Sequence, residues 1–283
     1  MLFGVYKAPI LRSLRTFSSR PANLGVAMNF ILEKKRFTGL NSCVLRFKIP
    51  NEAGDLSSLP VPSGVKLVLN GQEKSYSPVS LPSEVDYMDI LVKPYAPVTG
   101  GGFGAFLCDL NIGDTAPMKV KPPRSIHGSK ETIVRRYGMV ALVGGGTGVA
   151  PLIQIAKAEL LSNSVTPVRF LSVNQGVEDI LMKQELLIME EENRGRFKVT
   201  FLDTSAGDRG DVQLVKEALL LEEASVDSSR LTSKRMVFVC GCDGFVDYWA
   251  GGIVRDENKK KIQGPLRGLL SDAGLTSDEV YKF

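Results

Sequence analysis

Between Met28 and Pro123, hydrophobic and polar positions alternate over short stretches separated by proline, glycine and serine. Alternation with a period of two places successive side chains on opposite faces of a strand, and the turn-forming residues favour hairpins. We therefore expect an antiparallel sheet or a small β-barrel in this part of the chain. The predicted strands include Phe30–Lys34, Cys43–Ile49, Val65–Leu69, Tyr87–Val92 and Thr115–Val120.

After Tyr137 the pattern changes to short apolar runs that alternate with amphipathic stretches. Such runs indicate buried strands, and the stretches between them indicate helices that cover both faces of a parallel sheet. The predicted strands are Val140–Val143, Val168–Val173, Val199–Leu202, Met236–Val239 and a final strand at Glu279–Phe283. The predicted helices are Leu152–Leu161, Ile180–Glu192, Val212–Leu221 and Phe245–Ile253.

These two patterns divide a chain of 283 residues, which is long enough for two domains with separate cores. The predicted fold class is α/β plus all-β. We expect a targeting or anchoring segment over 1–27, an antiparallel β-barrel domain over 28–124, a polar linker over 125–136 and a Rossmann-like parallel α/β domain over 137–283.

The most informative local sequence is Val140–Pro151, where an apolar run leads into a glycine cluster and then into an amphipathic helix. In this order the glycines let a ligand approach the backbone, and the helix N-terminus faces an anion such as a pyrophosphate. A glycine-rich turn without a ligand has the same pattern, and the spacing departs from G-x-G-x-x-G. Met236–Gly241 is a second strand that ends in glycine, so both turns are expected at one carboxyl edge, where ligands bind.

The formal net charge of +4 comes from the N-terminal segment. Lys7, Arg12, Arg15 and Arg20 precede the first acidic residue, Glu33, and the rest of the chain has 31 basic and 31 acidic side chains. This neutral body argues against a nucleic-acid partner. Arginine, serine and apolar residues at helical spacing are typical of a mitochondrial transit peptide, so we expect a location in the matrix or at the inner membrane; an amphipathic anchor is the alternative. No apolar run approaches the ~20 residues that span a bilayer.

Cysteine and histidine limit the chemistry further. Cys43, Cys108, Cys240 and Cys242 match neither a zinc site nor a disulfide framework, and we expect no metal. The single histidine, His127, would have to be the base of any Ser-His-Asp hydrolase.

Several motifs, in order, are similar to those of NADH–cytochrome b5 reductases, which belong to the ferredoxin-reductase-like flavoproteins. Lys74–Ser80 resembles the family's flavin motif Arg-Pro-Tyr-Thr-Pro-Val-Ser, and Gly138–Pro151 resembles its Gly-Met-Ile-Ala-Gly-Gly-Thr-Gly-Ile-Thr-Pro. Asn174–Leu181 matches Asn-Gln-x-x-Glu/Lys-Asp-Ile-Leu, Cys240-Gly241 matches the start of Cys-Gly-Pro-Pro, and the terminal Phe283 also fits. The resemblance runs from about residue 28 to the end and implies FAD and NADH as cofactors.

On the flavin side, the resemblance implies that Tyr76 packs on the isoalloxazine, that Ser77 hydrogen-bonds it and that Lys74 contacts the FAD phosphate. Gly100–Gly104 falls on a segment that holds the pyrophosphate, but the family's lysine and serine are glycines here. Losing one cation and one hydroxyl predicts FAD binding weaker by about tenfold or more. The candidate FAD-binding residues are Lys74, Ser75, Tyr76, Ser77, Leu91, Tyr95, Gly101, Gly102, Phe103 and Gly104.

On the nicotinamide side, the resemblance places Thr147 and its neighbouring glycines against the NADH pyrophosphate and the flavin edge. It places Lys93 near both rings and Cys240 beside the nicotinamide, although a buried core cysteine is the alternative for Cys240. Asp203 matches a family acid that repels the 2′-phosphate of NADPH, so NADH is the predicted donor. The candidate catalytic residues are Lys93, Thr147 and Cys240, and the other candidates for cofactor binding are Gly145, Gly146, Gly148, Ala150, Asn174, Asp179, Asp203 and Gly241.

Two functions compete. The first is an FAD-dependent oxidoreductase that passes electrons from NADH, by hydride transfer to flavin, to a one-electron acceptor such as a cytochrome. The second is a weakened or inactive accessory subunit of a mitochondrial complex, because Lys74, Gly102, Gly104 and Ala150 depart from the family on the flavin side. We expect the enzyme; an NADH-sensing module is a third hypothesis. The neutral body is mild evidence against a small acidic cytochrome as the acceptor.

Overall fold

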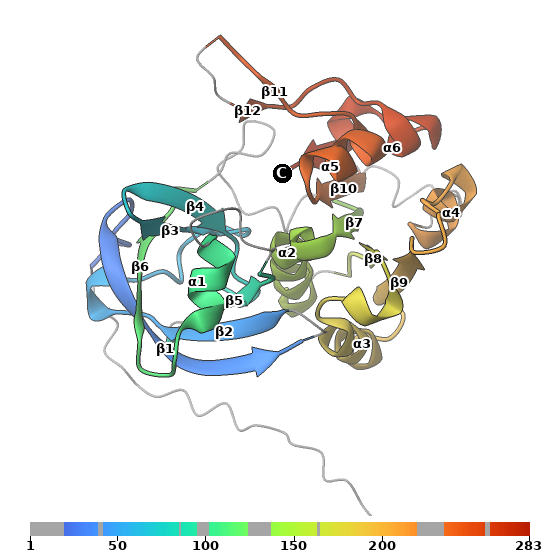
Figure 1. The fold of residues 1–283 in the computed structure, drawn as a ribbon. Coiled ribbons are helices and arrows are strands. Elements are labelled where there is room, and N and C mark those ends of the chain that lie inside the picture. Colours follow the sequence, from blue (N-terminus) through green and yellow to red (C-terminus); the bar gives the residue numbers. More distant parts are fainter. Residues whose placement is uncertain are drawn as a thin grey trace, which may run out of the picture.

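The computed structural model describes residues 20–38, 42–84, 86–94, 102–123, 137–162, 165–219, 235–257 and 261–283. An antiparallel sheet forms in the first half of the chain and a parallel sheet, covered by helices, in the second (Figure 1). The predicted fold class is confirmed. Most of the predicted N-terminal segment and all of the linker 125–136 lie outside the described residues, so the domain limits stay predictions.

Six strands form the antiparallel sheet, in the order β4-β3-β6-β1-β2-β5. Met28, Phe30 and Leu32 of the first strand alternate into a common apolar core, as the sequence pattern predicts. A bridge between Pro78 and Ile90 connects the two ends of the sheet, so that it closes as a barrel. The strands are β1 (Ala27–Phe37), β2 (Cys43–Lys48), β3 (Val65–Leu69), β4 (Gln72–Tyr76), β5 (Tyr87–Val92) and β6 (Thr115–Val120).

Two elements of this half were not predicted. Strand β4 is exposed along most of its length, so it lacks apolar alternation and forms because it pairs with β3. Helix α1 (Phe103–Asp109) has only seven residues and follows a run of glycines. It is held by the fully buried Leu107, which packs into the barrel core.

The parallel sheet has the strand order β13-β10-β7-β8-β9. Its strands are β7 (Met139–Gly145), β8 (Val168–Asn174), β9 (Phe197–Asp203), β10 (Arg235–Cys240) and β13 (Val280–Lys282). Its helices are α2 (Val149–Leu161), α3 (Lys183–Glu192), α4 (Val212–Ala218), α5 (Asp243–Ala250) and α6 (Gly268–Asp272). Helix α6 and the hairpin β11 (Val254–Arg255) with β12 (Lys261–Ile262) were not predicted. Short 3-10 turns lie at Asn51–Ala53, Gly146–Gly148, Val177–Asp179 and Ser277–Glu279.

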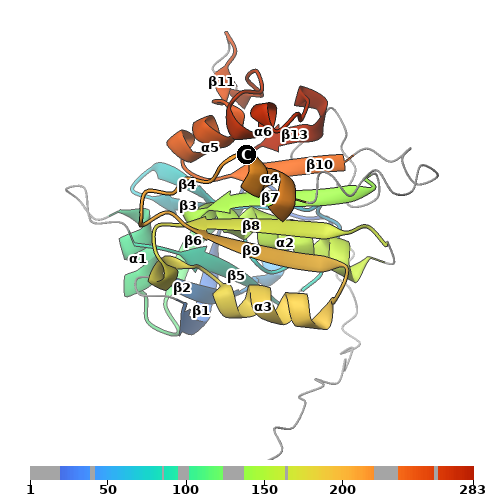
Figure 2. The same cartoon turned by 90° about the vertical axis from the view of Figure 1, so that its right-hand side faces the viewer.

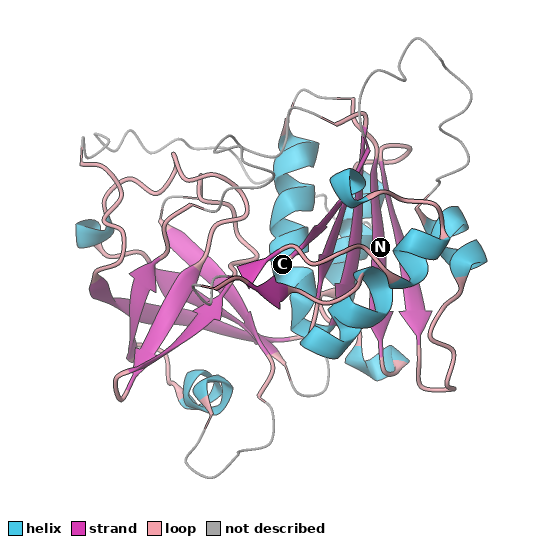
Figure 3. Ribbon diagram, turned by 90° about the horizontal axis from the view of Figure 1, so that it is seen from above, coloured by secondary structure: helices cyan, strands magenta, loops and turns pink. Residues whose placement is uncertain are grey.

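The helices cover the two faces of the parallel sheet in separate layers (Figure 2). Helix α2 lies between the sheet and the barrel, as Figure 3 shows from another side. Val44, Val79 and Leu91 of the barrel half belong to the same buried cluster as residues of α2, so the interface between the halves is apolar. Within the described residues, none of the helices combines the length and the apolar character needed to cross a bilayer.

Candidate functional site

A cleft of about 1270 Å³ lies where the barrel meets the carboxyl edge of the parallel sheet. This volume exceeds the roughly 300–1,000 Å³ that is usual for one small-molecule site. The end of β4 and the start of α1 form its barrel side, and the ends of β7, β8 and β10 form the opposite side. The predicted meeting of strand ends at one edge is therefore present in the structure.

The cleft brings together most of the residues that the sequence singled out. Asp203 ends β9 next to the cleft but does not line it, whereas its neighbours Thr204 and Ser205 do. Tyr95 and Gly101 lie outside the described residues. Those on the cleft wall are Lys74, Ser75, Tyr76, Ser77, Leu91, Lys93, Gly102, Phe103, Gly104, Gly145, Gly146, Thr147, Gly148, Ala150, Asn174, Asp179, Cys240 and Gly241. Their roles toward a cofactor stay predictions.

The glycine turn after β7 packs directly against the end of β10. A Cβ atom added to Gly148 would lie 2.2 Å from the carbonyl oxygen of Cys240 and 2.6 Å from the nitrogen of Gly241. Gly146 has a φ of +54°, a conformation that L-residues rarely adopt, and a Cβ there would meet nothing within 4 Å. Gly148 is thus required for packing, and Gly146 leaves backbone open to the cleft.

Tyr76 and Lys93 form the barrel side of the cleft. Burial, with a contribution from the nearby Cys108, raises the pKa of the Tyr76 hydroxyl to about 12, so this group stays protonated at neutral pH. The Lys93 ammonium lies 2.9 Å from an Asp179 carboxylate oxygen across the interface. Two residues that the sequence assigned to different cofactor regions are therefore an ion pair in the structure.

Several lining residues were missed by sequence reasoning. Three of them follow β9: Ser205, Gly207 and Arg209. Their position directly after the third parallel strand could have indicated that they lie at the ligand-binding edge of the sheet. Phe245, Tyr248 and Trp249 occupy one side of α5 at the spacing i, i+3, i+4, inside the helix predicted over Phe245–Ile253.

The Phe245 ring fills the space between the two glycine turns. A Cβ atom on Gly145 would lie 2.6 Å from its Cδ2 atom, and one on Gly241 would lie 2.4 Å from its Cδ1 atom. The Trp249 ring centroid is 5.8 Å from that of Phe245. The carboxyl edge of the sheet therefore offers an apolar floor between two segments of open backbone.

A dinucleotide fits the residues on this edge. The Asn174 side chain is buried and donates to the carbonyl and hydroxyl oxygens of Ser172, both at 3.1 Å, while its own Oδ1 atom has no hydrogen-bond partner within the described structure. An unsatisfied buried acceptor is costly, and a ligand hydroxyl or amine would satisfy it. A Cβ on Gly102 would meet nothing within 4 Å, so the wall on the barrel side also has room.

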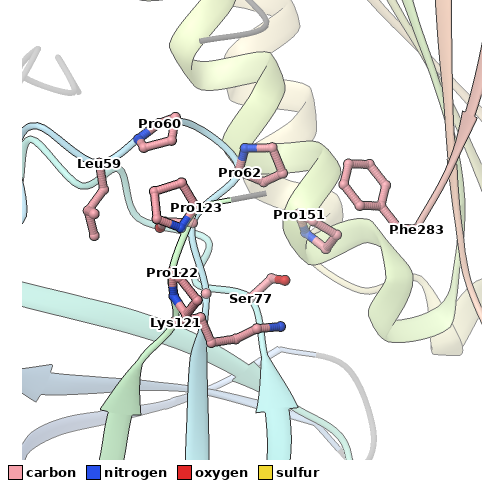
Figure 4. Close-up of a pocket in the computed structure, with 11 residues that line it drawn as sticks. Leu59, Pro60, Pro62, Ser77, Lys121, Pro122, Pro123, Pro151 and Phe283 are labelled. Carbon is pink, nitrogen blue, oxygen red and sulfur yellow. The ribbon is translucent and has the colours of Figure 1, made fainter. Parts of the chain in front are cut away.

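A much smaller cavity of about 20 Å³ lies beside the cleft and shares Ser77, Pro151 and Phe283 with it (Figure 4). Figure 4 shows Phe283 beside Pro151 at one end and a group of prolines at the other. Because proline has no backbone N–H, such a wall leaves few donors to satisfy at the interface. The wall members are Leu59, Pro60, Pro62, Pro122 and Pro123.

Helix α2 is hydrogen-bonded to the last residues of the flavin motif Lys74–Ser80. The fully buried Gln154 side chain donates to the Ser80 carbonyl at 2.6 Å and accepts the Ser63 backbone N–H at 2.6 Å. Lys157, one turn later, donates to the Val79 carbonyl at 2.8 Å. The helix that begins at the glycine turn thus holds the flavin-motif loop, which fixes the two walls of the cleft relative to each other.

We expect Gln154→Leu to lower the free energy of unfolding by about 2 kcal/mol, because the Ser63 N–H and the Ser80 carbonyl lose their buried partner. The Ser63 amide should also exchange its hydrogen faster with solvent. Urea unfolding and hydrogen–deuterium exchange measure the two effects. Gln213→Leu, at an exposed position of α4, is the control and should change neither. Unchanged Ser63 protection in Gln154→Leu would contradict the prediction.

The comparisons with known proteins agree with this geometry. The sequence model of the oxidoreductase FAD-binding domain matches residues 29–127, and that of the oxidoreductase NAD-binding domain matches residues 142–250. The chain thus has one domain for each of the two predicted cofactors, FAD and NAD, and the cleft lies between them.

Curated relatives carry the name NADH-cytochrome b5 reductase. One from Emericella nidulans is 31% identical over 241 residues, which are 79% of this chain and 73% of that protein. One from Neosartorya fischeri is 34% identical over 201 residues, which are 65% of this chain. The chain spans only 62% of the length of the Neosartorya fischeri protein and 60% of that of a Coccidioides immitis relative.

Solved structures show the same fold. The cytochrome b5 reductase domain of Ulva prolifera nitrate reductase superposes with a TM-score of 0.69 at 20% identity, covering 93% of this chain and 99% of that one. Phthalate dioxygenase reductase gives a TM-score of 0.64 at 17% identity, covering 91% and 67%. From the relatives' sequences and the matching pair of domains, the chain belongs to the NADH–cytochrome b5 reductase family.

Proposed function

We propose that this chain is an FAD-dependent oxidoreductase that takes electrons from NADH and passes them to a one-electron acceptor. The observation that carries the proposal is the single cleft lined both by Tyr76 and Ser77 of the flavin motif and by Thr147 and Cys240 of the sheet edge. Bound FAD would supply a ring that accepts a hydride and releases electrons singly. Both sets of residues face one cavity, which favours direct transfer between two cofactors.

The chain's own residues would bind, orient and exclude water. Tyr76, which is partly buried, would give the flavin an apolar surface to pack on. The open backbone around Gly146 would receive a pyrophosphate, because backbone N–H groups in such turns bind anions. Lys93, held by Asp179, would place one cation where the two cofactors meet. No proton-transfer residue is needed for this chemistry.

The acceptor is proposed to be a haem protein of the cytochrome b5 kind, because the relatives are named as reductases of that protein. The absence of lysine and serine at Gly102 and Gly104 favours a second candidate, a reductase-like accessory subunit of a mitochondrial complex. Both positions line the cleft, so they bear on flavin affinity rather than on the fold.

A visible spectrum of the purified full-length chain under anaerobic conditions separates the two candidates. With FAD added, the enzyme should show flavin absorbance that NADH bleaches. NADPH should bleach it more slowly, since the acid at the end of β9, Asp203, would repel the 2′-phosphate. A folded chain that takes up no FAD and ignores NADH would refute the enzyme and favour the accessory subunit.

We also propose that the chain is targeted to mitochondria, in the matrix or at the inner membrane. The support is the arginine- and serine-containing composition of residues 1–27, which lack acidic side chains. Residues 1–27 fused to a fluorescent protein should be imported by isolated mitochondria. The matched fusion with Arg12, Arg15 and Arg20 changed to glutamine should stay outside, and equal import of both fusions would contradict the proposal.

A further inference from the structure

Two cysteines that the function does not use lie side by side in the barrel half. Cys43 starts β2, and Cys108 lies near the end of α1, 65 residues later. Their sulfur atoms are 3.5 Å apart, and both are free thiols. Cys43 is 1% exposed, whereas Cys108 is only partly buried. An oxidant can therefore reach Cys108 from solvent, whereas Cys43 is covered by the surrounding protein.

The surroundings make the two thiols chemically unequal. The Lys35 ammonium donates to the carbonyl oxygen of Cys108, which keeps a positive charge beside that residue. The hydrogen bond between the two thiols, together with the positive charge of Lys35, lowers the pKa of the Cys108 thiol. The same hydrogen bond and burial raise the pKa of Cys43. Cys108 is therefore the more easily ionised thiol of the two and the one expected to react first with an oxidant.

The pair is mechanically connected to the cleft. Phe103 and Gly104, in the first turn of α1, line the cleft on its barrel side. A Cβ on Gly104 would lie 3.1 Å from the Lys93 carbonyl oxygen, so α1 packs closely on the end of β5. Cys108 also packs on the barrel core together with Tyr76. A shift of α1 would therefore move the wall that faces the proposed flavin.

We propose that Cys43 and Cys108 form a reversible dithiol–disulfide pair, oxidised by a peroxide, and that closing the disulfide weakens FAD binding. The sulfurs must approach from 3.5 Å to about 2.05 Å, which draws the end of α1 toward β2. The first turn of α1, which lines the cleft, would then shift with the helix. The thiol chemistry stands by itself, and only the effect on FAD rests on the proposed function.

The reaction balances with hydrogen peroxide as the oxidant. The Cys108 thiolate attacks one peroxide oxygen, the O–O bond breaks and hydroxide leaves, so that Cys108 becomes a sulfenic acid. The Cys43 sulfur then attacks the Cys108 sulfur; the S–S bond forms, the S–O bond breaks, and the oxygen leaves as water with the Cys43 proton. Two thiols lose two electrons, which reduce one peroxide. An added dithiol reverses the reaction.

Peroxide titration of the full-length chain, followed by alkylation and peptide mass mapping, tests the pair. We expect one Cys43–Cys108 disulfide per chain, formed before the exposed Cys242 is oxidised. In Cys43→Ser, dimedone should trap a sulfenic acid at Cys108. In Cys108→Ser, Cys43 should remain an unmodified thiol. Trapping at Cys43 instead, or oxidation of Cys242 with no Cys43–Cys108 disulfide, would overturn the proposal. Circular dichroism checks that each variant is folded.

FAD affinity, measured by flavin fluorescence before and after oxidation, tests the second part of the proposal, namely that the disulfide weakens FAD binding. We expect about tenfold weaker binding in the disulfide form, the change that follows loss of one hydrogen bond to a charged group. Peroxide should not change the affinity of Cys43→Ser and Cys108→Ser by this amount. A disulfide that leaves FAD affinity unchanged would refute the coupling. If neither form binds FAD, the proposed function fails while the disulfide remains measurable.

Discussion

Gly148→Ala is expected to slow flavin reduction by NADH about a hundredfold and to lower the free energy of unfolding by about 3 kcal/mol. The added methyl would lie 2.2 Å from the carbonyl oxygen of Cys240. Neither backbone segment can move freely, because Cys240 pairs with Gly144 in the sheet and α2 begins directly after Gly148. The turn must therefore shift away from β10, which misplaces both cleft walls.

Gly244→Ala is the matched control. Gly244 also lines the cleft, but a Cβ there would meet nothing within 4 Å and its backbone is helical. Alanine favours a helix over glycine by about 1 kcal/mol, so this variant should be as stable as the parent or slightly more. Stopped-flow absorbance under anaerobic conditions gives the rate, and urea unfolding gives the stability. A Gly148→Ala variant with the parent's rate would show that the turn tolerates the methyl.

All strands of the two sheets except β4 could be predicted, because their apolar pattern is decided locally. Strand β3 was predicted at its observed limits, since Val65 and Leu67 face the core and their neighbours do not. The exposed β4 could not be predicted, because its stability comes from its partner strand. Helix α1 is too short for periodicity and depends on one buried leucine, Leu107.

The cleft was predictable to the extent that it consists of strand ends. Parallel strands end at one edge, so Gly145, Cys240 and Asn174 could be brought together from the sequence alone. The contacts of Gln154 could not be predicted, because a glutamine in an amphipathic helix usually faces solvent. Only the position of the barrel buries this side chain and lets it hydrogen-bond to Ser63 and Ser80. Phe245 was missed for a related reason: its place between two turns depends on how α5 packs across them.

The C-terminal strand is stabilised by a buried lysine. Lys282 is 3% exposed, and its ammonium lies within hydrogen-bonding distance of four carbonyl oxygens. These belong to Ala250 and Gly252, at 3.3 and 3.4 Å, and to Gly264 and Pro265, at 2.8 and 3.2 Å. One side chain thus joins the end of α5 to the segment that follows β12. It also stands next to Phe283, which lines the cleft.

Lys282→Met should lower the free energy of unfolding by on the order of 3 kcal/mol. The buried carbonyls would lose their hydrogen-bond donor. This loss destabilises the fold by more free energy than is gained by removing one buried charge. Urea unfolding at neutral pH measures the loss. Lys261→Met, at an exposed position of β12, is the control and should change stability by less than about 0.5 kcal/mol. Equal stability of the two variants would contradict a structural role for the Lys282 ammonium.

The pH dependence of the difference in unfolding free energy between the parent chain and Lys282→Met tests whether the Lys282 ammonium is desolvated. Burial lowers the pKa of Lys282 from its ordinary value of 10.5, and Asp247 opposes this only in part. Below the lowered pKa, folded and unfolded chains are both protonated at this lysine, so the cost of burying the charge is present in full. As the pH rises from there toward 10.5, the folded chain gives up the proton first and the unfolded chain binds more protons, so the free energy of unfolding rises. The stability advantage of the parent chain over Lys282→Met should therefore grow with pH in this window, and a difference that stays constant or shrinks would mean that the ammonium is not desolvated.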